Sequence, residues 1–467
     1  MRDKRVVIVG GGASGVILAA HLLRLPGRDL RVTLIERAGT IGRGVAYGTP
    51  EPSHILNTRA ASMSAFADDA DHFWRWLLRS GASADTRCSD PFCFVPRRVY
   101  ADYLGDLTRS WRAGAGDGRL DVVTGDCVGI REVQGGIAAE LADRTVHVGD
   151  VAVLATGHDL PEPAADSPYV SPWMVPREAG IAPADRVFVI GTGLSMVDAV
   201  VGLANSGHRG RITALSRHGK LPLAHQRTTP MRIDAADVPF GTDISYLLRW
   251  FRRTAGWVAE RGGDWRDVMD GVRPHVAEIW QSLSPAARRR FLRHARTFWE
   301  IHRHRMPPES ELRLHGAMAT SHLDLVAGRF LGIEPDGAGV RVHFRRRGAA
   351  APESLVVAKV VDCKGILRDP AEAGAGLVRT LIDKGAARPD PLRIGLDVDG
   401  ACAVVDRDGR ASPRLFAIGP VTRARFWEVT AIPDIRVQCA HLAQRLAETL
   451  TRDGAAAPGG LTSLSIY

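Results

Sequence analysis

The sequence lacks the features that assign many proteins to a functional class at a glance. It has no C-x-x-C pair, no G-x-S-x-G or H-E-x-x-H motif, and no apolar run long enough to cross a membrane. The first residues are charged and lead into a short apolar run at 6–9, so no signal peptide is expected. These absences argue against a membrane protein, a secreted protein and a hydrolase, and they favour a cytoplasmic location.

Cysteine is scarce, and the six cysteines are scattered, as is typical of a reduced cytoplasmic protein. Cys88 and Cys93 have the C-x-x-x-x-C spacing of the disulfide reductases. However, Pro91 lies between them, and they are far from the helix after the second strand, where that redox pair belongs. We therefore expect two unrelated loop cysteines without a redox role.

Arginine greatly outnumbers lysine and supplies most of the positive charge behind the net charge of +9 and the pI of about 9.6. The arginines are spread along the whole chain, without a lysine-rich tail or a basic stripe interleaved with aromatic residues. A nucleic-acid partner is therefore not expected. A positive field would instead suit NADPH or an anionic substrate.

Short apolar runs that end in glycine recur along the chain, as buried parallel strands do. Two of these runs begin near-duplicate units, V-V-I-V-G-G-G-A-S-G from Val6 and V-F-V-I-G-T-G-L-S-M from Val187. A chain of 467 residues is also long enough for two or three domains. The duplication predicts an α/β fold with two Rossmann-like nucleotide-binding units.

The first unit has the pattern Gly10-x-Gly12-x-x-Gly15 between a strand at 6–9 and a helix at 16–23. The first glycine permits a tight turn, the second lets the backbone approach a pyrophosphate, and the third lets helix pack on strand. The helix N-terminus then offers N–H groups to the phosphates. Glu36 ends the next strand, where an acid holds a ribose diol. The unit predicts dinucleotide binding, because a plain glycine-rich turn would leave Glu36 unexplained.

Later strand ends favour FAD over NAD in this unit. Thr156 and Gly157 close one apolar run and Gly419 closes another, and FAD needs such extra strand ends because it is longer than NAD. A helix predicted at 435–450 begins after the last run, and its N-terminus could stabilise negative charge on a reduced flavin. The alternative is a purely structural helix start.

The second unit is weaker than the first. Gly191 and Gly193 follow a strand, but Met196 stands in the place of the third glycine, which relaxes the contact between helix and strand. The next strand leads to Arg217 rather than to an acid, and an arginine there can pair with a 2′-phosphate. This pattern favours NADPH over NADH. The alternative is a decayed unit that only packs, with Arg217 on a solvated loop.

The plan of the chain follows from these two units. Trp, Leu, Phe and Arg recur at helical spacing between 242 and 314, which predicts a helical insertion. We expect an FAD-binding domain at 1–160 and 355–453 and an NADPH-binding domain at 161–241 and 315–354. A tail at 454–467 is expected to lie outside both domains.

Several short segments match a known family. They are G-R-G-V-A-Y-G from Gly42, H-I-L-N-T from His54, M-S-A-F from Met63, P-R-R-V-Y from Pro96, the segment 191–198, R-H-R-M-P-P-E from Arg303, and W-E with P-D-I-R from Trp427. In these segments, which span nearly the whole chain, the sequence resembles the two-dinucleotide-binding flavoproteins. It resembles most the bacterial FAD/NAD(P)-binding family related to the N-hydroxylating flavin monooxygenases.

The resemblance implies a set of cofactor contacts. The ADP part of FAD would be held by Gly10, Gly12, Ser14, Gly15, Glu36, Arg37 and the backbone of Val128. The flavin ring and its ribityl chain would lie near Gly44, Asn57, Met63, Gly419 and Ile432. For the second unit, the glycine motif itself and the end of the next strand predict NADPH contacts at Gly191, Gly193, Ser195 and Arg217.

The chain departs from relatives at two places. Lys364 stands where relatives usually have a small threonine, close to an expected interdomain crossing. The fingerprint F-x-G-x-x-x-H-x-x-x-W is absent around 157–173, so a Baeyer–Villiger reaction is not expected.

No metal site is expected. His302 and His304 are two residues apart, and such residues face apart on a helix. The surrounding Arg-His cluster is interpreted as a solvated helix end or as an anion contact.

The expected chemistry is that of a flavin, which needs orientation, electrostatics and a dry pocket rather than a protein nucleophile. His54 and Asn57 are the candidates beside the ring, as proton carrier and hydrogen-bond donor, although His54 could equally pack a turn. We expect an FAD- and NADPH-dependent monooxygenase that uses O₂ on a small metabolite, with an amine or amino acid as a candidate substrate. An FAD oxidoreductase without oxygen insertion and a flavoprotein kept for binding are the alternatives.

Overall fold

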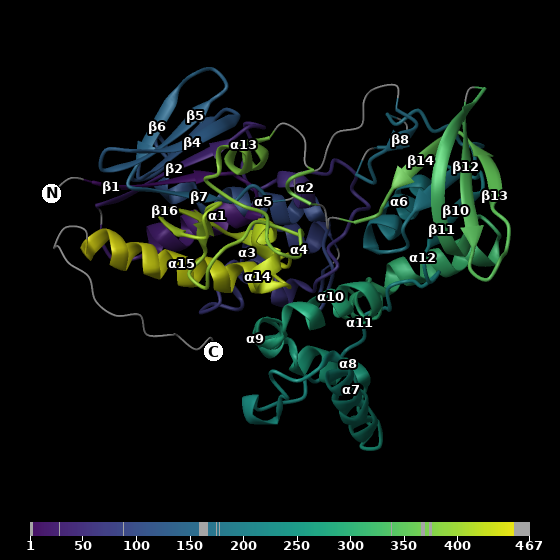
Figure 1. Ribbon diagram of the computed structural model, residues 1–467. Coiled ribbons are helices and arrows are strands. Elements are labelled where there is room, and N and C mark those ends of the chain that lie inside the picture. The colour runs from purple at the N-terminus through teal and green to yellow at the C-terminus, as the bar shows by residue number, and fades with distance from the viewer. Residues whose placement is uncertain are drawn as a thin grey trace.

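The computed structural model describes residues 3–452 except 28, 87, 158–166, 174, 177, 338, 366–368 and 373–375. Three parts are visible in Figure 1: an α/β body with the first strand and the last helix, a second α/β body, and a group of helices below them. The fold is α/β, as the duplicated strand–glycine–helix pattern predicts. Among the described helices, none combines the length and apolarity that a bilayer crossing requires.

A six-stranded sheet, in the order β15-β16-β7-β1-β2-β3, forms the centre of the first body. Its strands are β1 (Lys4–Val9), β2 (Leu30–Glu36), β3 (Leu120–Thr124), β7 (Val151–Leu154), β15 (Ala403–Val405) and β16 (Ala411–Ala417). All pairs are parallel except β15 with β16. Val6 and Ile8 of β1 point into one core and Val7 into another, which explains why the whole run is apolar.

Different elements cover the two faces of this sheet. One face carries α1 (Ala13–Arg24), α5 (Arg97–Leu107) and α15 (Ile432–Arg452). The other carries α13 (Leu377–Lys384) and an antiparallel sheet of β4 (Cys127–Val133), β5 (Gly136–Leu141) and β6 (Val146–Gly149). Short elements surround them: α2 (Gly44–Tyr47), α3 (His72–Arg79), α4 (Ala82–Asp85), η1 (Ala60–Ser62) and η2 (Arg109–Trp111).

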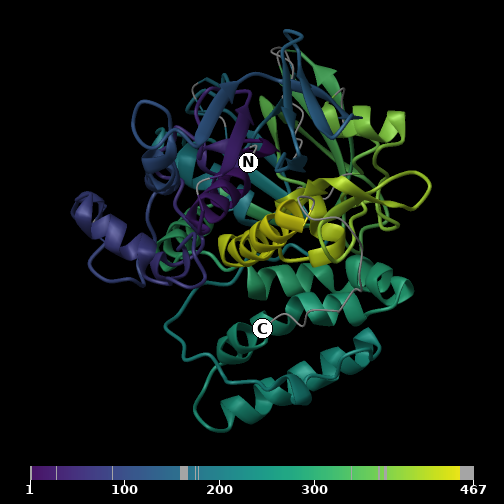
Figure 2. The same ribbon diagram turned by 90° about the vertical axis from the view of Figure 1, so that its left-hand side faces the viewer.

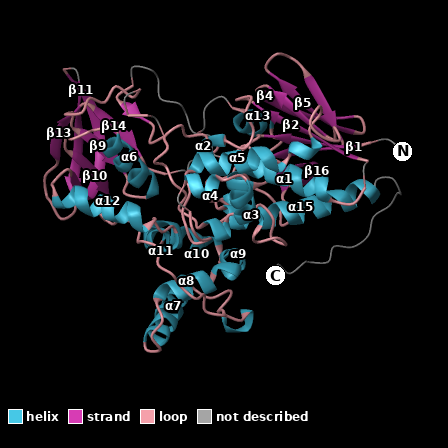
Figure 3. Ribbon diagram, turned by 180° about the vertical axis from the view of Figure 1, so that it is seen from behind, coloured by secondary structure: helices cyan, strands magenta, loops and turns pink. Residues whose placement is uncertain are grey.

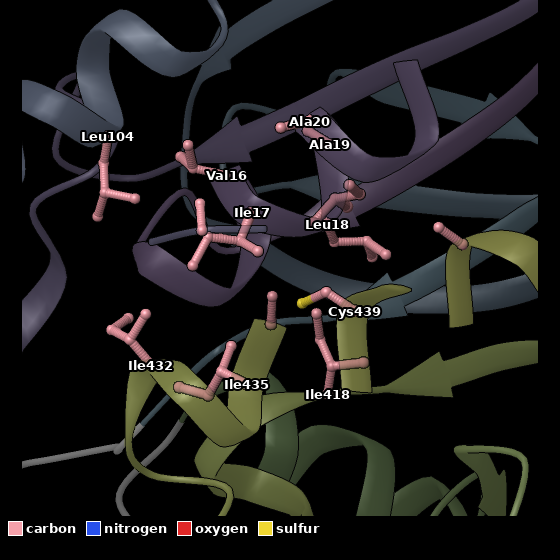
Figure 4. Close-up of a cluster of buried hydrophobic side chains, with 14 of the residues drawn as sticks. Val16, Ile17, Leu18, Ala19, Ala20, Leu104, Ile418, Ile432, Ile435 and Cys439 are labelled. Atoms are coloured by element: carbon pink, nitrogen blue, oxygen red, sulfur yellow. The ribbon is translucent and has the colours of Figure 1, made fainter. Parts of the chain in front are cut away.

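The first and last long helices lie side by side, although they are almost the whole chain apart (Figures 1 and 2). Figure 4 shows Ile17 of α1 and Ile435 and Cys439 of α15 in one buried cluster. Burial of each such aliphatic side chain stabilises the fold by about 1.5–3 kcal/mol. The helix predicted at 435–450 therefore exists, and it begins at Ile432.

The second body contains a seven-stranded sheet in the order β13-β12-β11-β10-β9-β14-β8 (Figure 3). The strands are β8 (Tyr169–Val170), β9 (Val187–Ile190), β10 (Ile212–Ser216), β11 (Leu323–Asp336), β12 (Gly339–Arg346), β13 (Glu353–Val357) and β14 (Lys359–Asp362). β12 pairs antiparallel with both β11 and β13, and the other pairs are parallel. The helices α6 (Leu194–Asn205) and α12 (Pro308–Ala319) share a core with β9 and β10.

The helical part consists of α7 (Ile244–Ala259), α8 (Trp265–Gly271), α9 (Val276–Ser282), α10 (Pro285–His294) and α11 (Arg296–Arg303), with the turns η3 (Ala235–Asp237) and η4 (Arg273–His275). Its aromatic core also contains Trp427, which follows η5 (Gly419–Thr422) and α14 (Arg423–Phe426) of the first body. The Trp280 ring N–H donates to the Ala424 carbonyl at 2.8 Å. The helical part is thus anchored to the first body.

Two of the expected domain boundaries differ from the structure. Residues 355–362, which the sequence analysis places in the FAD domain, belong to β13 and β14 of the second sheet. The predicted boundary at 314 falls inside α12, whose Leu314 is buried in the core of the second body. Both differences arise because a strand or helix is assigned by what it packs against, which local patterns do not reveal.

The expectation of two unrelated cysteines is wrong, because Cys88 and Cys93 form a disulfide with Cα atoms 5.4 Å apart. Asp90 makes the turn between them, accepting at its side chain from the Phe92 N–H at 2.7 Å and at its carbonyl from the Cys93 N–H at 3.1 Å. Pro91, which the sequence analysis treats as an obstacle, lies within this turn and is compatible with it.

Candidate functional site

The first glycine turn is held against the end of β7. Gly10 has φ +107°, and a Cβ there would lie 2.4 Å from the Ala155 carbonyl oxygen. A Cβ at Gly15 would lie 2.0 Å from the Gly10 carbonyl oxygen, so α1 packs directly on the turn. Both positions therefore require glycine for the reasons that the motif predicts.

An anion-binding surface lies over this turn. Gly12 is the N-cap residue of α1, and neither a capping side chain nor an acid in the first turn neutralises the helix N-terminus. Glu36 accepts from the Gly11 N–H at 2.7 Å and from the Ala38 N–H at 2.9 Å. Its carboxylate is thus fixed at the end of β2, where a ribose diol would be held.

The strand ends beside this turn also fit a long dinucleotide. The Thr156 hydroxyl is buried and has no hydrogen-bond partner among the described residues, so it is free to bind a ligand. Gly419, with φ +71°, approaches so closely that a Cβ would lie 2.4 Å from Ser14 Oγ. The Gly419 N–H donates to Gln438 Oε1 of α15 at 2.7 Å, a contact that the sequence analysis missed. Together, the bare turn, the fixed acid and the unpartnered hydroxyl fit the ADP half of FAD.

Three other predicted contacts lie around this groove. Gly44, with φ +52°, faces Gly12 closely enough that a Cβ there would be 3.3 Å from the Gly12 Cα. Gly157 also has a positive φ, of +67°, at the end of β7. Arg37 is exposed just after β2, and Val128 is 39% exposed in β4. The adenine contact through Val128 stays a prediction.

The second glycine turn repeats the first in the other body. Gly191 has φ +111°, and a Cβ there would lie 2.2 Å from the Cys363 carbonyl oxygen at the end of β14. Gly193 is the N-cap residue of α6, again without a capping side chain, whereas Met196 is fully buried. Arg217 is exposed directly after β10. This arrangement fits a second dinucleotide with its diphosphate at the N-terminus of α6.

A cavity of about 620 Å³ lies where the three parts meet. The predicted residues Asn57, Met63 and Ile432 line it from the first body, and Ser195 lines it from the second. Lys364 also lies at this cavity, and its ammonium is 3.1 Å from Asp362 Oδ2. Three of the residues predicted for the flavin and one predicted for the second nucleotide therefore line the same cavity, whereas Gly44, Gly419, Gly191, Gly193 and Arg217 are not among the lining residues.

The two predicted catalytic residues occupy different surroundings. His54 is only 2% exposed, does not line the cavity, and has Nδ1 2.7 Å from Thr49 Oγ1. Burial lowers its pKa, and the α6 residue Gly202 packs beside it. The alternative of a packed turn thus describes its surroundings better than a proton carrier does. Asn57 does line the cavity, and its carbonyl accepts from His225 Nε2 at 2.9 Å.

Arginines from the helical part form a wall of the cavity that the sequence analysis did not assign as a site. Arg303 and Arg305 are 9% and 3% exposed, so the Arg-His cluster is not a solvated helix end. Arg423 of α14 also lines the cavity and is 4% exposed. The sequence pointed to this wall only through the Arg-His cluster, for which an anion contact was one of two interpretations.

A buried carboxylate lies behind this wall. Glu428 accepts from the Trp299 ring N–H at 2.7 Å, and its Oε2 is 3.4 Å from Arg303 Nε and 3.8 Å from His304 Nε2. Burial raises the pKa of Glu428, but His304 and Arg303 lower it more, so the group stays ionised. Burial also lowers the pKa of His304 and, with Arg305, that of His225, to about 3 for His225.

The comparisons with known proteins agree with this geometry. A family model described as FAD-NAD(P)-binding matches residues 7–159. Among curated proteins, none matches the sequence.

Solved structures similar to the whole chain include N-hydroxylating enzymes. The ornithine N-hydroxylase of Kutzneria sp. 744, solved with reduced FAD, NADP⁺ and L-ornithine, is 16% identical with a TM-score of 0.66, over 97% of this chain and 100% of that one. The L-lysine 6-monooxygenase of Pseudomonas syringae is 16% identical with a TM-score of 0.63, over 96% and 100%. The FAD-bound cadaverine monooxygenase of Erwinia amylovora is 12% identical with a TM-score of 0.65, over 99% and 97%.

The match at residues 7–159 covers the first glycine turn and Glu36, and the structural similarity covers both glycine turns and the helical part. The chain therefore has the fold of the two-dinucleotide-binding flavoproteins that includes the N-hydroxylating monooxygenases, and its N-terminal domain matches the FAD-NAD(P)-binding family.

Proposed function

We propose that the protein is an FAD- and NADPH-dependent monooxygenase that hydroxylates an amine nitrogen of a small metabolite with O₂. The observation that carries this proposal is the shared cavity, lined by Asn57, Met63 and Ile432 of the first body and by Ser195 at the N-terminus of α6. A flavin and a nicotinamide held at the two glycine turns would both reach this space. Bound FAD would supply the redox chemistry, with electrons from NADPH and oxygen from O₂.

The chain's own residues would bind, orient and exclude water. Glu36 and the N-terminus of α1 hold the ADP end, and the N-terminus of α6 holds the second diphosphate. Arg97 and Asp198 form an ion pair of 2.6 Å between the two bodies, with side chains 14% and 12% exposed. This contact helps keep the two nucleotide sites facing one cavity.

The first test separates NADPH binding from FAD binding. Gly193→Asp would place a carboxylate at the N-terminus of α6, where its backbone is extended and a Cβ meets nothing within 4 Å. Because aspartate is a good N-cap residue, the helix should fold normally, yet its charge should repel a diphosphate. We expect full FAD absorbance and at least a tenfold slower anaerobic bleaching of the flavin by NADPH.

Asn205→Asp is the matched control, because it adds the same charge at the exposed C-terminal end of the same helix. It should bleach at the rate of the unchanged protein. Equal rates in Gly193→Asp and Asn205→Asp would contradict NADPH binding at α6.

The second test addresses oxygen insertion. With ¹⁸O₂ and a substrate that accelerates NADPH consumption, we expect the label in an N-hydroxylated product and little hydrogen peroxide. NADPH consumption that yields only peroxide or an unlabelled product would favour the alternative, an FAD oxidoreductase without oxygen insertion.

A further inference from the structure

The lining of the cavity between the three parts contains more basic residues than carboxylates. Among the described residues that line it, seven are arginines and one is a lysine, whereas only Asp270 and Glu300 are carboxylates. Four further carboxylates, Asp198, Asp362, Glu428 and Asp434, form ion pairs with lining residues from outside the lining. Burial lowers the pKa of His225, to about 3, and that of His304, whereas Glu428 beside His304 raises the latter. With these ion pairs counted, the cavity keeps a smaller excess of positive charge, which favours an anionic ligand.

Three of these arginines are buried with guanidinium nitrogens that have no hydrogen-bond partner among the described residues. They are Arg303 at Nε and Nη2, Arg305 at Nε and Nη1, and Arg423 at Nε. Buried donors without acceptors cost about 1–3 kcal/mol each, and more when charged, so such groups call for a partner, which can be a ligand, an ion or an ordered water.

The nearby carboxylates offset part of this charge but leave these donors without hydrogen bonds. Arg303 Nε forms an ion pair with Glu428 Oε2 at 3.4 Å, yet neither atom has a hydrogen-bond partner among the described residues. Arg305 pairs with Asp270 through Nη2 alone, which leaves its other two nitrogens available. The nearest carboxylate to Arg423 is Glu300, at 3.8 Å from Nη2, which is too far for a hydrogen bond. Asp434 is engaged by Arg273 at 2.8 Å and lies 3.8 Å from Arg303.

The phosphates of the cofactors have other candidate partners. Their diphosphates are matched by the N-termini of α1 and α6, and a 2′-phosphate by Arg217. Arg303 and Arg305 lie at the end of α11 and just after it, and Arg423 lies in α14, so none of the three belongs to either glycine turn. Their unpaired donors are therefore left for the substrate.

Resting on the proposed function, we propose that the substrate is a small amine with two anionic groups, such as an amino dicarboxylic acid. Arg303 with Arg305 would bind one anionic group, and Arg423 the other, by the forked hydrogen bonding that guanidinium offers to carboxylate. Because the cavity of about 620 Å³ also has to admit the reacting ends of two cofactors, the substrate is small. This charge class differs from lysine, ornithine and cadaverine, which the similar structures are named for.

The first experiment measures binding without turnover. The FAD-loaded protein is titrated with L-aspartate, L-glutamate and succinate, and in parallel with L-lysine, L-ornithine and cadaverine, while the flavin absorbance spectrum is recorded. We expect at least one dicarboxylate to perturb the spectrum with a Kd at least tenfold lower than that of any of the three cationic amines. Tighter binding of a cationic amine, or no perturbation by any dicarboxylate, would overturn the proposal.

The variants test whether the charge of the cavity recognises the ligand. Arg423→Gln should raise the Kd for the best dicarboxylate at least tenfold while FAD absorbance is retained. Should that variant not fold, Ser62→Asp adds a carboxylate to the cavity wall and should weaken the same ligand, whereas the isosteric control Ser62→Asn should not. Equal Kd values for Ser62→Asp and Ser62→Asn would contradict the proposal.

The readouts keep the two proposals separate. A dicarboxylate that binds but does not accelerate NADPH consumption would support the charge class and contradict the monooxygenase. Lysine or ornithine that drives NADPH consumption, with no response to dicarboxylates, would support the monooxygenase and overturn the charge class.

Discussion

The two glycine turns begin alike and then diverge. Gly10 and Gly191 adopt φ +107° and +111°, and each lies so close to the carbonyl of a neighbouring strand that a Cβ would come within 2.4 and 2.2 Å. Both helices begin at a glycine without a capping side chain. The common half of the two units is therefore the half that would meet a diphosphate.

The two units differ at the third glycine position of the motif and at the end of the strand that follows the helix. Gly15 lets α1 touch its own turn, whereas Met196 fills the corresponding place in α6 with a buried side chain. Glu36 is fixed by two backbone N–H groups, whereas Ser216 lies 2.9 Å from the Thr192 hydroxyl and Arg217 is exposed. We infer that the first unit binds its cofactor tightly and that the second unit binds and releases its cofactor in each turnover.

The largest effect should come from Gly15→Ala, which should abolish FAD retention and lower the soluble yield. Its Cβ would lie 2.0 Å from a backbone oxygen, and backbone cannot move aside as a flexible side chain can. The ratio of flavin to protein absorbance after purification measures the loss. Gly105→Ala, in helix α5 with open space at its Cβ, is the control and should keep its flavin. Normal flavin content in Gly15→Ala would contradict the claim that the first turn requires glycine at this position.

Met196→Ala should affect the other body: it should destabilise the second body, whereas FAD stays bound to the first. Met196 is fully buried, and large-to-small changes of this kind cost about 2–5 kcal/mol. Denaturant unfolding, followed alongside flavin absorbance, would separate the two bodies. Met318→Ala, at a half-buried position on the same core, should cost clearly less. Loss of flavin as large as in Gly15→Ala would mean that the two bodies do not behave separately.

Glu36→Gln should weaken FAD binding to the apoprotein by roughly 10- to 150-fold. The amide loses a charged acceptor for the Gly11 and Ala38 N–H groups and for a ribose hydroxyl, worth about 1.5–3 kcal/mol at most. Fluorescence titration with FAD measures the change. The exposed Glu132→Gln serves as control and should bind as the unchanged protein does. An unaltered Kd for FAD in Glu36→Gln would show that the Glu36 carboxylate does not contribute to FAD binding.

The smallest effect is expected for Arg217→Gln, which should raise the KM for NADPH about tenfold and leave that for NADH unchanged. Loss of one charge-assisted contact to a 2′-phosphate costs about 1.4 kcal/mol, which corresponds to this factor. Steady-state reduction of an artificial acceptor reports both constants. Arg211→Gln, at the opposite end of β10, should change neither. A similar rise with NADH would indicate lost folding rather than lost phosphate recognition.

The sequence was informative where function depends on neighbours in the chain. The strand–glycine–helix order at Gly10 and Gly191 predicted both nucleotide units, because a tight turn and a bare helix start are local properties. The acid at Glu36 and the arginine at 217 lie at strand ends for the same reason.

Contacts between residues far apart in the chain could not be predicted from the sequence. Arg305 and Arg423 are more than a hundred residues apart and line one cavity, and no periodicity connects them. Gln438 supports Gly419 from a helix face that local patterns cannot orient. The placement of β14 between β9 and β8 likewise depends on strand pairing, which composition does not specify.

The contact between α1 and α15 has a consequence for synthesis of the protein. Ile17 and Leu18 emerge from the ribosome early, but their partners Ile435 and Cys439 are made last. At about 5–20 residues per second, this apolar helix face waits for roughly 20–80 seconds. During that time the intervening bodies can fold while the nucleus of the flavin domain remains incomplete and prone to aggregation. Co-expressed chaperones, or a circular permutant that joins the two helices in sequence, should therefore raise the yield of native protein.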